Sequence, residues 1–502
     1  MSSEPQVQPA TPEVARSVRL VIVSIGLLLL LASLDQTIVS TALPTIVADL
    51  GGLDHLSWVV TAYILASTVV APLYGKVGDL YGRRNTVVVS VGLFLLGSAL
   101  CGLATSMTFL IVARALQGLG GGGLFVLALS VIGDVIAPRD RGKVQGVFAA
   151  VFGASSVIGP LIGGWFVEAF SWHWIFYINI PLGGVAVAGF LASFKPRGVR
   201  VGHAIDWWGA AALSVSLAAL TLVTSLGGRS YGWGSPLIVA VGALALAAAA
   251  AFLAIEARAE EPILPLGLFR MNVFWVTSVI GFIAGAAMFG SITFMPIYLQ
   301  IAQGASPTES GLMLVPMTVG ILAASTLAGR HMTRTGRYRR IPILGAAFLT
   351  LGMLLLSRLE PDTSVARFSL SLATVGLGMG CIFPVVTTAV QNAVPREVMG
   401  TATAAGLMFR QVGGSLAVAA FGAIFAARLA GAVGGVDLGG GEIGPQMLEG
   451  LPEATRATVA LSVADALRPV FWIAAGLGAL GLLFALALEE VPLLNRMAPQ
   501  GE

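Results

Sequence analysis

Asp35 and Arg114 are the two residues whose types and positions most clearly indicate chemistry, because each places a charge inside a long apolar run. Asp35 lies in the segment LDQTIVSTALP, and Arg114 lies in the segment LIVARALQGLGGGG. If both segments are membrane helices, a rise of about 1.5 Å per residue puts Asp35 roughly 13 Å and Arg114 roughly 10 Å below the same membrane surface. Ionisable residues at such depth are expensive to bury and are usually functional.

This matched depth makes Asp35 and Arg114 the strongest candidates for a functional pair of charges. Burial favours the protonated carboxyl group of Asp35, whereas a nearby guanidinium group favours the carboxylate, so Asp35 can take up and release a proton. Two alternatives remain open at this stage. Either Asp35 is a structural carboxylate paired with a neighbouring helix, or Arg114 extends along its own helix to the membrane surface.

Arg410 is a third charge inside an apolar run, in the segment FRQVGGS, and Gln411 follows it. An unpaired guanidinium group at that depth needs a carboxylate, backbone carbonyl groups or water. We therefore predict that Arg410 and Gln411 form either a structural latch or a gate for the substrate. The sequence names no partner for Arg410.

The composition indicates that membrane helices position these residues. The 502 residues are 56% hydrophobic and 11% charged, whereas soluble proteins carry about 25% charged residues. Apolar runs of roughly 20 residues recur along the chain, which predicts an all-α polytopic membrane protein with about 14 transmembrane helices.

Several other functions are disfavoured by what the sequence lacks. Cys101 and Cys381 lie in apolar runs, and the four His residues are scattered, so we expect no metal site and no cofactor. The glycine run Gly118–Gly123 lacks the Gly-Lys-Ser/Thr ending of a phosphate-binding loop, which disfavours an ATP-driven pump. No nucleophile–base pair is evident within the helices, so an intramembrane enzyme is the less favoured alternative. We expect no nucleic-acid partner.

The two ends of the chain resemble each other, which predicts a duplicated fold. The segment GLGGGGLF (Gly118–Phe125) matches GLGMGCIF (Gly376–Phe383), and the loop that begins at Gly75 matches the loop that begins at Gly329. Helices before and after a central insertion therefore form two bundles. The predicted units are a cytoplasmic tail (1–19), an N-terminal six-helix bundle (20–200), two inserted helices (201–260), a C-terminal six-helix bundle (261–490) with an outer loop (428–468), and a second cytoplasmic tail (491–502).

The distribution of basic residues predicts the orientation. Most of the 28 Lys and Arg residues fall in segments on the same side as the N-terminus, and such residues are enriched on the cytoplasmic side. We therefore expect a multi-pass protein of the bacterial cytoplasmic (inner) membrane with both termini in the cytoplasm.

The loop GKVGDLYGRRN (Gly75–Asn85) is short, charged and rich in glycine, so it holds two antiparallel helices close together. Its pattern resembles the signature loop between the second and third helices of the major facilitator superfamily. In that family the loop latches the two halves of the transporter in the outward-open state. The resemblance implies that Asp79 faces the N-terminus of a helix in the other half and that Arg83 pairs with Asp134. The residues that it assigns to the latch are Gly75, Asp79, Gly82, Arg83, Arg84 and Asp134.

The run GASSVIGPLIGGW (Gly153–Trp165) gives the fifth predicted helix several small residues and a proline. One interpretation is generic close packing with a bend. The run is also similar to the motif that marks antiporters in this superfamily, and with the other motifs the resemblance covers essentially the whole chain. It narrows to the fourteen-helix drug:proton antiporters. The residues that match the antiporter motif are Gly153, Gly159, Pro160, Gly163 and Gly164.

This resemblance implies a proton-coupled secondary exporter of hydrophobic drugs, cationic or neutral, that works by alternating access. Protons would be the coupling ions. Asp35 would take up and release the proton, and Arg114 would adjust how readily it does so. The implied partners are a small hydrophobic substrate and the lipid bilayer, with room for a periplasmic adaptor protein if the cell is Gram-negative. An exporter of one endogenous lipid, peptide or antibiotic on the same fold is the alternative that the sequence leaves open.

Overall fold

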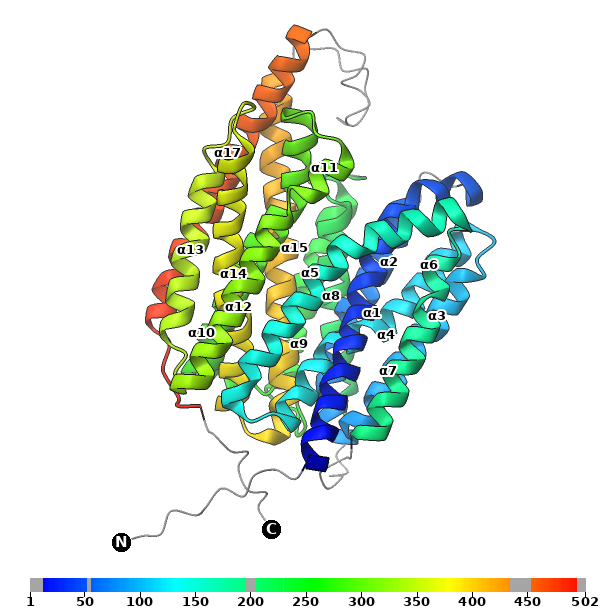
Figure 1. Cartoon of the computed structure of the whole chain (residues 1–502), viewed down its shortest axis with the longest axis vertical. Coiled ribbons are helices and arrows are strands. Elements are labelled where there is room, and N and C mark those ends of the chain that lie inside the picture. Colours follow the sequence, from blue (N-terminus) through cyan, green and yellow to red (C-terminus); the bar gives the residue numbers. More distant parts are fainter. Residues whose placement is uncertain (1–11, 52–55, 195–204, 229, 434–452, 494–502) are drawn as a thin grey trace.

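Long helices that run roughly side by side make up most of the chain (Figure 1). The computed structural model describes all residues except 1–11, 52–55, 195–204, 229, 434–452 and 494–502. The first helix begins and the last helix finishes at the same end of the molecule, which we call the lower end, as it appears in Figure 1.

The N-terminal group of helices, which we call the N-half, packs around its own apolar core. Its aromatic residues Phe94, Phe176 and Phe190 are fully buried. The helices of the N-half are α1 (Pro12–Leu50), α2 (Leu56–Tyr81), α3 (Arg83–Gly102), α4 (Met107–Val135), α5 (Pro138–Ala169), α6 (Trp174–Tyr177) and α7 (Asn179–Ser193).

The C-terminal group, which we call the C-half, has a separate core that includes Phe368, Leu372 and Val375. Its helices are α10 (Asn272–Ile297), the π-helical turn η3 (Tyr298–Ala302), α11 (Pro307–Leu312), α12 (Val315–Thr335), α13 (Arg340–Leu356), α14 (Val365–Ala393), α15 (Met399–Val433) and α17 (Glu453–Leu486). The 3₁₀ turns η2 (Leu266–Arg270) and η4 (Arg396–Val398) precede α10 and α15.

Two inserted helices, α8 (Trp207–Leu226) and α9 (Pro236–Glu256), pack against each other. Helix α8 lies on α2 of the N-half and α15 of the C-half, and residues of both inserted helices belong to an apolar cluster that these two helices share. The insertion therefore covers one side of the seam between the halves.

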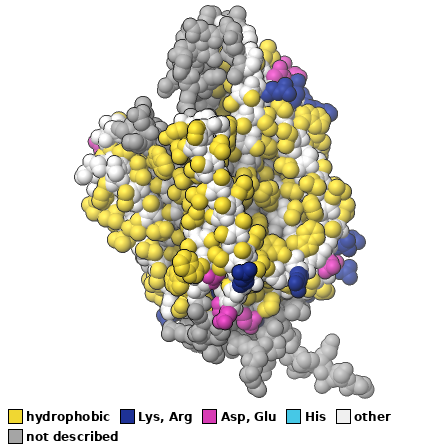
Figure 2. All heavy atoms as spheres, turned by 180° about the vertical axis from the view of Figure 1, so that it is seen from behind, with side chains coloured by type: hydrophobic (Ala, Val, Ile, Leu, Met, Phe, Trp, Pro, Cys, Tyr) yellow, Lys and Arg dark blue, Asp and Glu magenta, His cyan; other side chains and the backbone are white. Residues whose placement is uncertain are grey.

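The outer surface fits a bilayer. In the described part of the chain, 12 helices are long and apolar enough to cross a membrane. Helix α5, with 32 residues, and the shorter apolar helix α13, with 17 residues, complete the bundles. The predicted total of about 14 crossings is consistent with this arrangement and stays a prediction. Figure 2 shows a broad hydrophobic band on one face, with charged side chains above and below it.

The two halves repeat each other closely in α4 and α14. Both helices have 29 residues. Each begins at a serine whose side chain accepts a hydrogen bond from the first turn, Ser106 in α4 and Ser364 in α14, which satisfies one of the free N–H groups at a helix start. The break after α2 and the break after α12 both occur at a glycine with positive φ, Gly82 (87°) and Gly336 (68°).

Two predicted boundaries are wrong. Helix α1 begins at Pro12, so the predicted N-terminal tail (1–19) is partly helical. Helices α15 and α17 extend to Val433 and back to Glu453, so the predicted outer loop (428–468) is much shorter. The prediction started the last helix at Pro469, where the long apolar run begins. Upstream of it, however, buried residues recur at helical spacing, and these are Val459, Val463, Leu467 and Val470.

Candidate functional site

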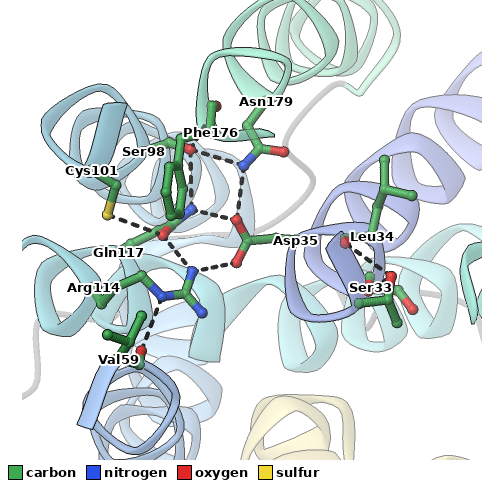
Figure 3. Close-up of polar contacts among 11 residues, drawn as sticks. Ser33, Leu34, Asp35, Val59, Ser98, Cys101, Arg114, Gln117, Phe176 and Asn179 are labelled. Carbon is green, nitrogen blue, oxygen red and sulfur yellow. Dashed lines mark hydrogen bonds and ion pairs between the residues drawn. The ribbon is translucent and has the colours of Figure 1, made fainter. Parts of the chain in front are cut away.

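Asp35 of α1 and Arg114 of α4 form an ion pair inside the N-half (Figure 3). Arg114 Nη1 lies 2.6 Å from Asp35 Oδ2, and both residues are 1% exposed. The other carboxylate oxygen, Oδ1, accepts hydrogen bonds from Gln117 Nε2 at 2.8 Å and from Asn179 Nδ2 at 2.9 Å. The carboxylate is thus held by a guanidinium group and two amide groups, which come from α4 and α7.

A second layer of contacts fixes the donors around Asp35. Ser98 Oγ of α3 accepts from Gln117 Nε2 at 3.1 Å and from Asn179 Nδ2 at 2.8 Å. Arg114 Nε donates to the carbonyl oxygen of Val59 at 3.2 Å, and the Arg114 guanidinium carbon lies 4.4 Å from the centre of the Tyr63 ring. We call the residues Asp35, Ser98, Arg114, Gln117 and Asn179 the polar cluster.

The sequence indicated that Asp35 and Arg114 lie at the same depth, but it did not identify Gln117 and Asn179 as their partners. Gln117 follows Arg114 by three residues, so helix geometry places the two on one face. That signal was available in the sequence. Asn179 stands in the apolar segment WIFYINIP, and only the packing of α7 against α1 and α3 shows that its amide points to the carboxylate.

This arrangement can couple a proton to a change of shape. The Asp35 carboxylate accepts one hydrogen bond on Oδ2 and two on Oδ1, and such donors compensate a buried negative charge. Protonation would leave the Arg114 charge uncompensated in an enclosed site and would require the cluster to rearrange. In this conformation Asp35 is closed off from solvent, so a proton reaches it only when the N-half opens.

The predicted latch residue Asp79 lies at the lower end, where α2 meets the start of α15. Its carboxylate accepts from the backbone N–H of Gly400 at 3.0 Å and of Thr401 at 2.7 Å. A carboxylate is stabilised at a helix N-terminus by the free N–H groups and the helix dipole. A methyl group at Gly75 would lie 2.6 Å from Ala404 Cβ, so only glycine lets the two helices approach this closely.

Arg83 links Asp79 to the end of α4. One guanidinium nitrogen lies 2.8 Å from Asp79 Oδ1 and another lies 2.8 Å from Asp134 Oδ2. Arg84, in contrast, points within the N-half, where Nη2 donates to the carbonyl oxygen of Leu191 at 3.4 Å. The structure therefore brings Asp79, Arg83 and Asp134 together and leaves Arg84 outside the contact between the halves.

A second crossing joins α5 to α12 on the opposite side of the lower end. A methyl group at Gly329 would lie 2.5 Å from the carbonyl oxygen of Gly142. Thr333 Oγ1 donates to the carbonyl oxygen of Arg139 at 3.1 Å, and the Arg139 side chain donates to the carbonyl oxygens of Thr333 and Arg334. This crossing uses a hydroxyl group and the Arg139 guanidinium group on backbone carbonyl oxygens, where the first uses a carboxylate on backbone N–H groups.

The glycines of the predicted antiporter motif lie on α5 beside α1. A side chain at Gly159 would collide with Thr37, and one at Gly163 would lie 3.2 Å from the carbonyl oxygen of Ile38. These contacts are one turn from Asp35. Gly164 has open space around it, and the surroundings of Gly153 and Pro160 lie outside the described residues.

Arg410 and Gln411 occupy the middle of α15. Gln411 Nε2 lies 3.4 Å from Thr68 Oγ1 of α2, across the seam. Arg410 is half-buried, and its guanidinium carbon lies 4.9 Å from the centre of the Phe383 ring. No carboxylate of the described chain pairs with Arg410, whose side chain lines a small cavity between α10, α14 and α15.

Comparison with known proteins agrees with this fold. The family model described as Major Facilitator Superfamily matches residues 25–205 and 192–418. An uncharacterized MFS-type transporter of Mycobacterium tuberculosis is 42% identical over 473 residues, which cover 93% of this chain and 69% of the relative. The multidrug transporter protein MdtP of Bacillus subtilis is 40% identical over 409 residues, which cover 82% of this chain and 75% of that protein.

Among solved structures, the proton:xylose symporter XylE superposes with a TM-score of 0.62 at 14% identity, covering 95% of this chain and 97% of that chain. That similarity shows the fold alone. The family match spans most of the chain, and both the family and the fold are those of transporters, not of enzymes. The chain belongs to the major facilitator superfamily, as the resemblance of its signature loop indicated.

Proposed function

We propose that the chain is a proton-coupled exporter of small hydrophobic compounds that works by alternating access across the bacterial cytoplasmic membrane. The observation that carries this proposal is the enclosed ion pair of Asp35 and Arg114. The relative MdtP, which is called a multidrug transporter and is 40% identical, supports drugs as the substrate class.

In this proposal the lower end faces the cytoplasm, and the described conformation is closed there. The closed contacts are those of Asp79 with α15 and of Gly329 with α5. A proton that enters from outside protonates Asp35, releases Arg114 from its charge partner and favours opening at the lower end. Release of the proton to the cytoplasm restores the ion pair of Asp35 and Arg114, and the completed cycle exports the substrate.

The orientation has a direct test. A reporter fused after Glu502 should be active in the cytoplasm, and one inserted near Gly440 should be active outside. A cytoplasmic signal at Gly440 would contradict the proposed arrangement of about fourteen crossings.

The transport cycle is tested in proteoliposomes that contain the purified chain. An imposed proton gradient should drive accumulation of a hydrophobic dye such as Hoechst 33342, and addition of the dye should cause proton movement in the opposite direction. The ionophore nigericin, which dissipates the gradient, should abolish accumulation. Accumulation that persists with nigericin would contradict proton coupling.

Drug sensitivity of a deletion strain would separate a multidrug exporter from one dedicated to a single endogenous compound.

A further inference from the structure

The small cavity of the C-half is lined mainly by apolar side chains and one cation. It lies between α10, α14 and α15, and its volume is about 20 Å³, enough for one water-sized group. The residues that matter for its chemistry are Gly281, Phe383, Thr387, Thr403, Leu407 and Arg410.

Arg410 is the group in this cavity that can recognise a ligand by charge. The hydroxyl of Thr387 donates to the carbonyl oxygen of Phe383 at 3.2 Å, and the hydroxyl of Thr403 donates to that of Met399 at 2.7 Å. Both hydroxyl protons are therefore engaged with backbone. The Arg410 guanidinium group carries five N–H donors and no acceptor. It lies over the face of the Phe383 ring.

Within the described part of the chain, the helices that line the cavity supply no counter-charge to Arg410. The sequences of α10, α14 and α15 contain neither Asp nor Glu. Helix α2, which faces α15, carries Asp79, but that carboxylate is engaged at the start of α15, more than two helical turns away. A cation at mid-membrane depth without a compensating acid is unfavourable unless backbone carbonyl groups, water or an anion from outside the chain complete the site. Of these partners, only an anion also neutralises the charge.

We propose that Arg410 binds the anionic group, a carboxylate or sulfonate, of an amphipathic substrate in a conformation in which this cavity is wider than its present volume of about 20 Å³, with the apolar body along Phe383 and Leu407. The inference rests on the proposed export function and names its substrate class. It also revises the expectation of cationic drugs. Asp35, the acid that would attract a cation, is enclosed with Arg114 in the N-half, whereas the accessible charge in the cavity is positive.

The test measures binding to the purified transporter in detergent, without a proton gradient, by the fluorescence of three probes with one apolar body. These are pyrenebutyrate, its uncharged methyl ester and pyrenebutylamine. The native protein should bind the carboxylate at least about tenfold more tightly than the ester, because a charge-assisted hydrogen bond is lost in the ester. Arg410→Gln should remove this preference, and Arg410→Lys should retain part of it. Arg428→Gln, an exposed arginine on the same helix, is the matched control and should behave as native.

Thermal stability separates a binding role from a structural one. Arg410→Gln removes a cation that no acid compensates, so the variant should unfold at the same or a higher temperature than the native protein. Pyrenebutyrate should raise the unfolding temperature of the native protein but not that of the variant. A large drop in the unfolding temperature of the variant, or equal affinity of the native protein for carboxylate and ester, would overturn the proposal.

A chloride titration distinguishes a site for an inorganic anion from a site for the anionic group of a substrate. If chloride alone stabilises the native protein but not Arg410→Gln, and pyrenebutyrate has no advantage over its ester, the site takes an inorganic anion and the substrate assignment is wrong. Because none of these measurements needs a proton gradient, a failure of proton coupling would leave their outcome unchanged.

Discussion

The helices α4 and α14 occupy equivalent places in the two halves, yet one carries a charged centre and the other is filled with hydrocarbon. Gly120 of α4 packs on the backbone of Ser90 and Phe94, and Gly378 of α14 packs on the backbone of Gly345 and Leu349. In the polar cluster of the N-half, Arg114 and Gln117 project from α4. The matching positions of α14 are Leu372 and Val375, both fully buried.

The repeated glycines and the unmatched charges therefore have different roles. The glycines that set the helix spacing are repeated, so the same backbone geometry stands in both halves. Among the described residues, the buried ion pair of α4 has no counterpart on α14, where buried apolar side chains take its place, as expected if a buried ion pair gives little net stability over hydrocarbon. This contrast agrees with the proposed function, in which the charges of the N-half exchange a proton.

The largest expected effect follows from removing the titratable group of the N-half. Asp35→Asn should abolish proton-driven export, because an amide beside Arg114 cannot take up and release a proton. The amide still offers an oxygen to Arg114, so the variant should fold. Dye accumulation in vesicles under an imposed proton gradient measures the effect. The control is Asp49→Asn, an exposed acid further along α1 that accepts from the Trp172 indole, and it should transport normally. Gradient-driven accumulation by Asp35→Asn would place the proton site elsewhere.

The next effect comes from making the N-half resemble the C-half. Arg114→Leu leaves the Asp35 carboxylate buried without its cation, and breaking such a pair should destabilise the protein by about 3–5 kcal/mol. The double variant Asp35→Asn with Arg114→Leu should recover most of this loss but should not transport. Chemical unfolding in detergent measures both. A single variant as stable as the native protein would mean that the polar cluster tolerates an uncompensated charge.

The two crossings at the lower end give a smaller contrast. Asp79→Asn removes the charge that caps α15 and should weaken the closed state by about 1–2 kcal/mol, or roughly tenfold in the open-to-closed ratio. Thr333→Val at the second crossing loses only a neutral hydrogen bond and should change the ratio less. Distances between spin labels at Asn85 and Arg337, which are exposed on opposite halves, report the ratio. Equal shifts for both variants would contradict a special role of the Asp79 carboxylate.

The smallest effect concerns the segment after the inserted helices. Lys76 of α2 lies 2.9 Å from Glu261, and the lysine side chain is 8% exposed. Lys76→Gln should shift the same open-to-closed ratio by less than about fivefold, since such a pair contributes up to about 1 kcal/mol. Arg330, at the matching position of the C-half, is exposed, and Arg330→Gln should have no effect. An effect at Arg330 as large as that at Lys76 would argue against coupling between the insertion and the seam.

The sequence by itself determined the class of fold and the principal charges. Helical apolar runs specify membrane helices because hydrocarbon leaves no other way to satisfy the backbone. A charge within such a run is detectable one residue at a time, which is why Asp35, Arg114 and Arg410 stand out. The signature loop could be read in the same way, because Asp79, Arg83 and their glycines are close in sequence.

Only the tertiary structure decided which groups meet. Asn179 reaches Asp35 from a helix 144 residues away, and no spacing rule connects them. Arg84 looked equivalent to Arg83 in the sequence, but the rotation of α3 turns it toward α7. The separation of the two kinds of charge was also invisible in the sequence. Asp35 is sealed in the N-half and Arg410 faces a cavity, because side-chain direction on a packed helix depends on its neighbours and not on its depth in the membrane.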